Sequence, residues 1–260
     1  MPEVWASGDK YEPYVGRWSR LVAAGFLAWL GVPPARRWLD VGCGTGALTA
    51  AILAQCDPAE VVGVDPSEGY VSWAARRLED GRARFMVGDA TRLPDGPFGA
   101  VVSGLVLNFV PGPAAAVHAM RCAAGPSGVV AAYVWDYAGR MELMRYFWDA
   151  AIALDPRAAA LDEGVRFPMC TPGRLEALWR DCGLGEVSSR AVDVPAVFGN
   201  FDDYWRPFLG GQGPAPGYCM SLDEDRRAAL REHLRHQLPV APDGSIRLNA
   251  RAWAVKGRSR

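Results

Sequence analysis

The chain has 260 residues, of which 50% are hydrophobic and 22% are charged, so a core of ordinary size can be buried. This composition argues against a disordered protein, a coiled coil and a collagen-like chain. The 28 basic and 29 acidic side chains leave a formal net charge of -1, without a basic run. Because binding to a nucleic-acid backbone is driven by neutralising many phosphates, nucleic acid is not expected as the main partner.

No segment has the pattern of a targeting signal or a membrane anchor. The N-terminus lacks a basic stretch followed by an apolar core. The longest apolar run, residues 21–32, has about 12 residues, too few to cross a bilayer. The six cysteines form no CxxC pair and the three histidines join no Cys/His cluster. We therefore expect no metal site and predict a protein of the reducing cytoplasm.

Short apolar runs alternate with segments of helical periodicity along the first half of the chain. We expect helices over residues 21–30, 47–55, 68–78 and 113–122, and strands over residues 38–41, 61–65, 84–87, 99–103 and 128–135. Strands that are separated by helices indicate βαβ units and a parallel sheet covered on both faces.

In the second half of the chain, strands and helices no longer alternate regularly. We expect helices over residues 141–154, 172–182 and 222–237, and strands over residues 186–194 and 246–255. The glycine- and proline-rich stretch 210–217 is interpreted as a loop and, as a hypothesis, as a mobile lid together with Tyr204 and Trp205.

Three motifs follow three successive strands. Asp40-Val-Gly-Cys-Gly-Thr-Gly46 forms a strand-to-helix turn, where glycines let a ligand approach the backbone and the helix offers free N–H groups. Asp65 ends the second strand, where a carboxylate can accept from both hydroxyls of a ribose. Gly88-Asp89-Ala90 ends the third strand, where an acid and a small residue suit an adenine amino group. All three lie at carboxyl ends of parallel strands, where open α/β sheets bind ligands.

Each motif also has a purely structural interpretation. The glycine turn can serve packing alone, Asp65 can cap the helix after Pro66-Ser67, and Asp89 can form a turn. A nicotinamide dinucleotide is the rival ligand, but its G-x-G-x-x-G pattern is not met, because Ala47 follows Gly46. A P-loop sequence is absent.

The three motifs resemble the cofactor site of class I S-adenosylmethionine-dependent methyltransferases. The resemblance extends over residues 14–135 and, less specifically, the final strand. Within that superfamily the chain is similar to the small-molecule branch of ubiquinone- and menaquinone-biosynthesis-like enzymes, and its opening Val15-Gly-Arg-Trp-Ser-Arg20 is similar to bacterial members. The resemblance implies an α/β fold with a doubly wound seven-stranded, mostly parallel sheet whose last strand is antiparallel. It also implies S-adenosylmethionine as donor, S-adenosylhomocysteine as product, and no metal.

The resemblance implies roles for individual residues. Gly42, Gly44 and Gly46 would cradle the amino-acid part of the donor, Asp65 the ribose, and Asp89 with Ala90 the adenine, while Ser103 and Leu105 would border the methionine. The full set of expected cofactor-binding residues is Arg17, Asp40, Gly42, Cys43, Gly44, Thr45, Gly46, Asp65, Pro66, Ser67, Gly88, Asp89, Ala90, Ser103 and Leu105.

The acceptor side is less defined, because methyl transfer needs a general base only if the nucleophile arrives protonated. The catalytic candidates are Asn108, Asp136 and Tyr14; Asn108 stands where related enzymes often carry a histidine. Asn108 as a turn former and Asp136 as a helix cap are the structural alternatives. The candidate acceptor-pocket residues are Tyr11, Tyr14, Asn108, Trp135, Met144, Tyr204 and Trp205.

We therefore predict one methyltransferase domain over residues 1–260 that acts on O, N or C of a small molecule. Its expected parts are an N-terminal cap helix (1–35), a cofactor-binding core (36–135), cap insertions (136–170 and 195–243) and sheet completion (171–194 and 244–260). The alternatives are a cofactor-binding protein without turnover and a methyltransferase of protein or nucleic acid. A monomer and a homodimer are both open.

Overall fold

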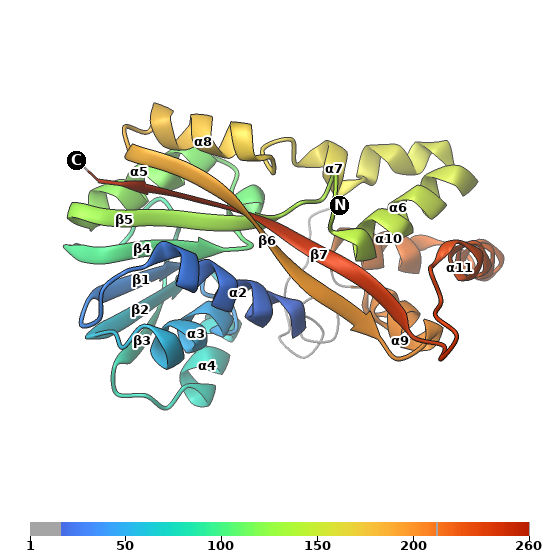
Figure 1. The fold of residues 1–260 in the computed structure, drawn as a ribbon, viewed down its shortest axis with the longest axis horizontal. Coiled ribbons are helices and arrows are strands. Elements are labelled where there is room, and N and C mark those ends of the chain that lie inside the picture. The colour runs from blue at the N-terminus through green and yellow to red at the C-terminus, as the bar shows by residue number, and fades with distance from the viewer. Residues whose placement is uncertain (1–16, 212, 260) are drawn as a thin grey trace. The chain divides into compact units, whose positions relative to one another are not determined.

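The computed structural model of the chain describes residues 17–211 and 213–259. Seven strands form one sheet (Figure 1). They are β1 (Arg37–Val41), β2 (Glu60–Asp65), β3 (Ala83–Val87), β4 (Phe98–Gly104), β5 (Ala124–Trp135), β6 (Gly185–Phe198) and β7 (Ile246–Arg258). Their order is β3-β2-β1-β4-β5-β7-β6, and one strand, β7, runs antiparallel to the others. The predicted doubly wound sheet is confirmed.

Helices connect the strands. The α-helices are α2 (Arg17–Leu30), α3 (Ala47–Gln55), α4 (Glu68–Arg77), α5 (Pro113–Ala123), α6 (Glu142–Leu154), α7 (Glu163–Arg166), α8 (Pro172–Asp181), α9 (Phe201–Trp205), α10 (Pro214–Ser221) and α11 (Glu224–Gln237). Short 3-10 helices are η2 (Leu107–Phe109), η3 (Pro156–Leu161) and η4 (Arg206–Gly210). Figure 1 shows α3 and α4 on one side of the sheet and α5 and α8 on the other. Right-handed crossovers require this arrangement, because the strand order extends in opposite directions from β1 and β4.

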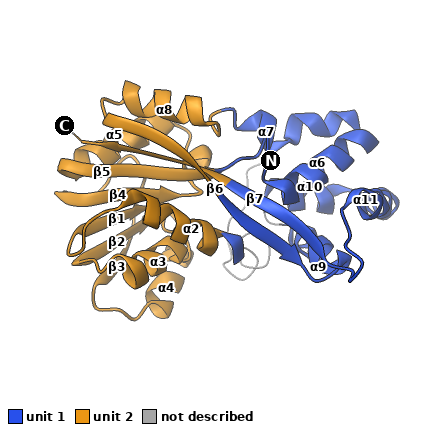
Figure 2. Ribbon diagram, in the orientation of Figure 1, with its two compact units in different colours: residues 1–18, 135–168, 193–251 blue, residues 19–134, 169–192, 252–260 orange. Residues whose placement is uncertain are grey.

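The chain divides into two compact units, coloured in Figure 2. Within the described ranges, unit 1 holds residues 17–18, 135–168 and 193–251, and unit 2 holds residues 19–134, 169–192 and 252–259. Unit 2 therefore contains β1 to β4 with the turns that follow them, which are the segments that carry the predicted cofactor motifs. The prediction of a single functional domain stays a prediction.

Strand register brings the motifs of unit 2 to one edge. In the parallel pair β1–β2, Asp40 lies opposite Gly63 and Val41 opposite Val64. In the pair β2–β3, Asp65 lies opposite Val87. The three strands therefore end together, and the segments that follow them emerge side by side.

The core of unit 2 is built from fully buried apolar side chains of the sheet and its covering helices. Trp38 of β1, Phe98 of β4 and Phe26 of α2 are each at most 1% exposed. Trp179 of α8 is also fully buried, and its indole Nε1 donates to the carbonyl oxygen of Val130 in β5 at 2.9 Å. Helix α8 is thus held to the sheet by packing and by a hydrogen bond.

Unit 1 has its own aromatic core. Phe147 of α6 stacks on Phe208 with ring centroids 4.5 Å apart, and Tyr204 lies 5.2 Å from Phe198. The indole of Trp148 donates to the buried Glu163 carboxylate at 2.5 Å. A core rich in aromatic rings explains why this half of the chain folds around short helices, since each ring removes a large apolar area from water.

Two local expectations differ from the structure. Residues 214–217 are the first turn of α10 rather than a loop, because Pro214 stands at a helix start, where its fixed φ angle favours the helix. Strand β6 continues past Val194 to Phe198. Pro195 is tolerated there because β6 is the edge strand of the sheet and does not need every backbone N–H.

We expect Trp179→Phe to lower the free energy of unfolding by about 1–3 kcal/mol, because the buried hydrogen bond to the Val130 carbonyl is lost. Urea denaturation measures the change. Trp73→Phe on the partly exposed surface of α4 is the matched control and is expected to change stability by less than about 0.5 kcal/mol. Equal effects of the two substitutions would contradict the assigned role of the Trp179–Val130 bond.

Candidate active site

The turn between β1 and α3 is locked by backbone hydrogen bonds. The N–H groups of Gly42 and Cys43 both donate to the carbonyl oxygen of Val64, at 2.7 and 3.0 Å, and the Gly46 N–H donates to Cys43 at 2.8 Å. The φ angles of Gly42, Gly44 and Gly46 are 74°, 52° and 82°, a region that L side chains disfavour. The glycines are therefore required by the backbone itself.

The three glycines differ in the space around them. A Cβ at Gly42 would lie 2.5 Å from Cγ1 of Val106, and one at Gly46 would lie 2.7 Å from Cδ1 of Leu78. A Cβ at Gly44 would meet nothing within 4 Å. Gly42 and Gly46 thus serve close packing, whereas Gly44 leaves open space in front of the turn, where a ligand can approach the backbone.

Asp65 ties this turn to the end of β2. Its Oδ2 accepts from the Gly44 N–H at 2.9 Å and its Oδ1 accepts from the Ser67 N–H at 2.9 Å. The residue is only 7% exposed, and burial raises the pKa of the Asp65 carboxyl. Ser67 in turn caps α4 by accepting from the Tyr70 N–H. Because each carboxylate oxygen has two lone pairs, Asp65 keeps acceptor capacity beyond these two bonds.

Asp40 is fully buried behind the turn. Its Oδ2 accepts from the Thr49 hydroxyl at 2.7 Å, but among the described residues its Oδ1 has no hydrogen-bond partner. Burial raises the pKa of the Asp40 carboxyl to about 7; the Thr49 bond opposes the rise and the negative charge of Asp65 adds to it. The negative charges of Asp40 and Asp65 repel each other, so a cation that binds beside these two carboxylates is stabilised.

The segment after β3 is open to solvent. A Cβ at Gly88 would lie 2.8 Å from Cγ1 of Val64, so Gly88 allows close packing on β2. Asp89 is exposed, and its Oδ1 accepts from the Thr91 N–H at 2.7 Å and the Thr91 hydroxyl at 2.5 Å, which lowers the pKa of Asp89. Asp89 therefore forms a turn, as its structural interpretation predicts, and its Oδ2 remains available.

The end of β4 carries an unusual backbone conformation. Leu105 has a φ angle of 61°, rare for a bulky side chain, and its N–H donates to the carbonyl oxygen of Tyr133 at 2.8 Å. Ser103, within β4, is 2% exposed. Strained residues that the surroundings hold in place cluster at functional sites, so the position of Leu105 beside a ligand stays a hypothesis that this conformation motivates.

Asn108 lies in η2, just beyond this point. It is 8% exposed, and among the described residues neither its Oδ1 nor its Nδ2 has a hydrogen-bond partner. An unpaired buried amide costs about 1–3 kcal/mol, so such a group needs an explanation beyond stability. The interpretation of Asn108 as a turn former does not account for its buried amide.

Other expected cofactor residues lie on the same turns. Cys43 and Thr45 are buried, Ala90 is half-buried, and Pro66 is exposed. Burial raises the pKa of the Cys43 thiol, so it stays protonated. Thr49 was not predicted; a hydroxyl in the first turn of the helix after a glycine turn is the signal that points to it.

The candidates in unit 1 have structural partners. The Asp136 Oδ2 accepts from the Arg140 N–H at 2.9 Å and its backbone carbonyl accepts from Met141, so it caps the turn before α6. The Arg17 guanidinium lies 4.7 Å from the Phe198 ring and makes a 3.3 Å ion pair with Asp203. Asp136 therefore has the structural role of a cap. Arg17 is held by packing and by its ion pair, but among the described residues its Nε and Nη2 are buried without a hydrogen-bond partner.

The remaining pocket candidates also lie in unit 1. Trp135, Met144 and Trp205 are at most 5% exposed, and the hydroxyl of the fully buried Tyr204 donates to the carbonyl of Leu143 at 3.0 Å. The structure uses these side chains to pack unit 1. Tyr11 and Tyr14 lie outside the described residues.

The described residues contain no group of three or more His, Cys, Asp or Glu side chains that could hold a metal ion. Within the same part of the chain, no helix has the length and apolar character needed to cross a membrane.

The chain is similar to known methyltransferases. A family described as "Methyltransferase domain" matches residues 39–128. The chain is 31% identical over 206 residues to the trans-aconitate 2-methyltransferase of Methylobacterium radiotolerans, covering 74% of this chain and 77% of that protein. It is also 31% identical to the demethylmenaquinone methyltransferase of Roseiflexus sp., covering 65% of this chain and 76% of that protein.

The solved structure of the YcgJ protein from Bacillus subtilis shares the fold. Its TM-score with this chain is 0.62 at 19% identity, with 92% of this chain and 98% of that chain covered.

We expect the stability of the ligand-free protein to fall between about pH 4 and pH 7. The unfolded Asp40 ionises near 3.8, whereas the folded residue has a pKa of about 7. Between these values the folded protein binds a proton that the unfolded chain lacks, so stability decreases as pH rises and levels off above about 7. Urea denaturation at pH 5 and pH 8 should differ by an amount on the order of 2–4 kcal/mol.

Asp40→Asn is the control for this pH dependence, because it removes the titrating group and keeps a partner for the Thr49 hydroxyl. The variant should lose most of the difference between pH 5 and pH 8. A wild-type profile that is flat over this range, or a slope unchanged in the variant, would show that Asp40 ionises normally.

Proposed function

Because the chain belongs to the class I S-adenosylmethionine-dependent methyltransferases, we propose that it transfers a methyl group to an oxygen, nitrogen or carbon atom of a small organic molecule. The two relatives above, each matched over about three quarters of its length, are named for small acceptors, trans-aconitate and demethylmenaquinone. The net charge of -1 fits such an acceptor better than a polyanion. The observation that carries the proposal is the glycine turn joined to Asp65.

The residues present fit the donor. The open space in front of Gly44 admits the amino-acid part beside the backbone of Gly42 and Gly46. The unpartnered Oδ1 of Asp40 supplies negative potential behind the turn, and Asp65 retains lone pairs for ribose hydroxyls. The exposed Asp89 Oδ2 and Ala90 are assigned to the adenine, and Ser103 with Leu105 to the methionine border.

When bound, S-adenosylmethionine supplies an electrophilic methyl group on a positively charged sulfur. The protein contributes to the reaction by aligning the acceptor with this methyl group and by excluding water. Alignment alone can lower the activation barrier by about 7–11 kcal/mol. Asp40 and Asp65 provide the negative field that favours a cationic ligand. The strained Leu105 backbone fixes the wall of the site where β4 ends.

We assign Asn108 to the acceptor. Its buried amide has one acceptor atom and one donor nitrogen without partners, so it can hold a carbonyl, hydroxyl or amine of the substrate. An amide is not a general base. This assignment therefore favours an acceptor whose nucleophilic atom needs no proton removed by the protein.

We further propose that the protein works in the cytoplasm. All six cysteines are free, which fits a reducing compartment.

We expect S-adenosylmethionine and S-adenosylhomocysteine, but not NAD, to raise the thermal stability of the protein. Ligand at about 100 times its Kd stabilises a folded protein by about 2.7 kcal/mol. Asp65→Asn should weaken both ligands at least about tenfold, because one charged acceptor is lost. Asp80→Asn, in the loop between α4 and β3, is the matched control and should leave affinity unchanged. Stabilisation by NAD alone, or none at all, would disprove the donor assignment.

A protein that binds the donor without turnover would give the same thermal shift. Incubation with donor and fractionated small metabolites separates the two, since only an enzyme yields a methylated product. Binding to RNA or protein that weakens steeply with salt would instead support a macromolecular acceptor.

We expect Asn108→Leu to stabilise the ligand-free protein by about 1 kcal/mol and to lower methyl transfer about tenfold, because the substitution removes an unpaired buried amide that serves only the acceptor. Chemical denaturation and product formation at saturating donor measure the two effects. Asn249→Leu is the contrast, since its amide nitrogen donates to Asp193 at 2.8 Å and the variant should be destabilised. Destabilisation by Asn108→Leu with full activity would refute the assignment.

A further inference from the structure

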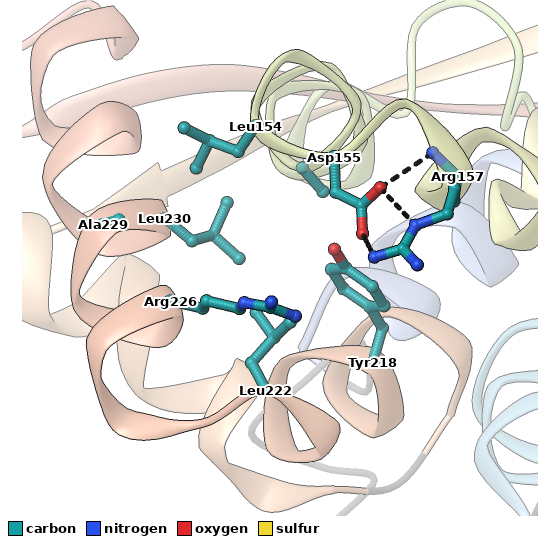
Figure 3. Close-up of a pocket in the computed structure, with 9 residues that line it drawn as sticks. Leu154, Asp155, Arg157, Tyr218, Leu222, Arg226, Ala229 and Leu230 are labelled. Atoms are coloured by element: carbon teal, nitrogen blue, oxygen red, sulfur yellow. Dashed lines mark hydrogen bonds and ion pairs between the residues drawn. The ribbon is translucent and has the colours of Figure 1, made fainter.

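Unit 1 contains a cavity that none of the residues assigned above lines. It has a volume of about 310 Å³ and lies between the end of α6, η3, α10 and α11 (Figure 3). Its apolar surface comes from Leu154, Leu222 and Leu230 with Ala151 and Ala229. Leu230 and Ala151 are 1% exposed and form part of the core beneath it. The volume is at the lower end of the range typical for small-molecule sites.

Four polar side chains complete the lining: Asp155, Arg157, Tyr218 and Arg226. Figure 3 shows the carboxylate, the two guanidinium groups and the phenol hydroxyl directed toward the same space. Aromatic packing holds Tyr218 in place, with its ring 5.6 Å from Trp148 and 6.3 Å from Phe147. The polar groups are thus gathered on one side of an apolar hollow.

The charges of the lining are not balanced. Asp155 is neutralised by Arg157, whose Nε and Nη2 donate to its two oxygens at 2.9 and 2.8 Å. The side chain of Arg226 is 67% exposed, its Nε makes an ion pair with Asp223 at 3.5 Å, and its charge also acts on Asp155. Among the described residues, the structure gives no hydrogen-bond partner to the terminal nitrogens of Arg226 or to the Tyr218 hydroxyl. One cationic fork and one hydroxyl donor therefore remain at the edge of the cavity.

We propose that this cavity binds a small organic acid, with its carboxylate on Arg226 and Tyr218 and its apolar body against Leu154, Leu222 and Leu230. A guanidinium presents parallel N–H donors that match a carboxylate, and a phenol hydroxyl adds a third donor. A cationic ligand is not expected, because the Asp155 carboxylate already accepts hydrogen bonds from Arg157. This site is independent of the proposed methyl transfer.

Titration calorimetry with 3-phenylpropionate as probe tests the proposal on the full chain. The acid should bind at least about tenfold more tightly than 3-phenylpropionamide, because only the acid forms charge-assisted bonds. The amine 3-phenylpropylamine should not bind. Equal binding of acid and amide, preference for the amine, or no binding of the acid would overturn the proposal.

Variants locate the binding. Arg226→Gln should weaken the acid about tenfold, and Tyr218→Phe should weaken it about threefold through loss of one hydrogen bond. Ala229→Trp places a large ring at an exposed lining position, so it should block the cavity without disturbing the core. Arg235→Gln, on the same helix but outside the lining, is the control and should bind normally. Full binding by the Ala229→Trp protein would overturn the proposal.

The Asp65→Asn protein separates this site from the donor site. It should bind 3-phenylpropionate as the wild type does, even where it no longer responds to S-adenosylmethionine. Loss of acid binding in this variant would place the acid at the turn between β1 and α3 and overturn the assignment to unit 1.

Discussion

The bond between the Asp65 carboxylate and the Gly44 N–H is the constraint on which the site depends. It joins the turn after β1 to the end of β2, while the Val64 carbonyl receives two further N–H groups from the same turn. With these bonds made, the glycine backbone is held in conformations that other residues disfavour. The turn proposed to hold the donor is therefore already formed without a ligand, so donor binding there would need little reorganisation.

Among the described residues of unit 2, the buried polar atoms without a hydrogen-bond partner include the Oδ1 of Asp40 and the amide of Asn108, besides one nitrogen each of Trp38 and Arg121. The unpaired atoms of Asp40 and Asn108 lower stability in the absence of ligand. Asp40 lies near the carboxyl end of β1, and Asn108 lies in η2, which follows the neighbouring parallel strand β4. A fold optimised for stability alone would replace Asp40 and Asn108 with apolar side chains, which is the reason for proposing that these two residues bind a ligand.

Local patterns were enough to predict the sheet, whereas the assignment of donor-binding residues at its strand ends stays a prediction. Glycine spacing and the acids that follow apolar runs are properties of short segments, and β1 to β5 lie where the apolar runs predicted. The pairing of Thr49 with Asp40 and the burial of Tyr204 depend on tertiary packing, which single-sequence periodicity does not report. The helix at Pro214 was missed because glycine and proline dominate its composition, although proline favours a first helical turn.

The raised pKa of Asp40 has a consequence for the charge of the protein. The formal net charge of -1 counts every carboxyl as ionised. A group whose pKa is about 7 carries on average about half a charge at neutral pH. The net charge of the folded protein is therefore less negative than the charge counted from its composition. Asp40 also exchanges its proton with the solvent near neutral pH. A cation that binds beside Asp40 would release a fraction of a proton, so ligand binding and buffer pH are coupled by charge regulation.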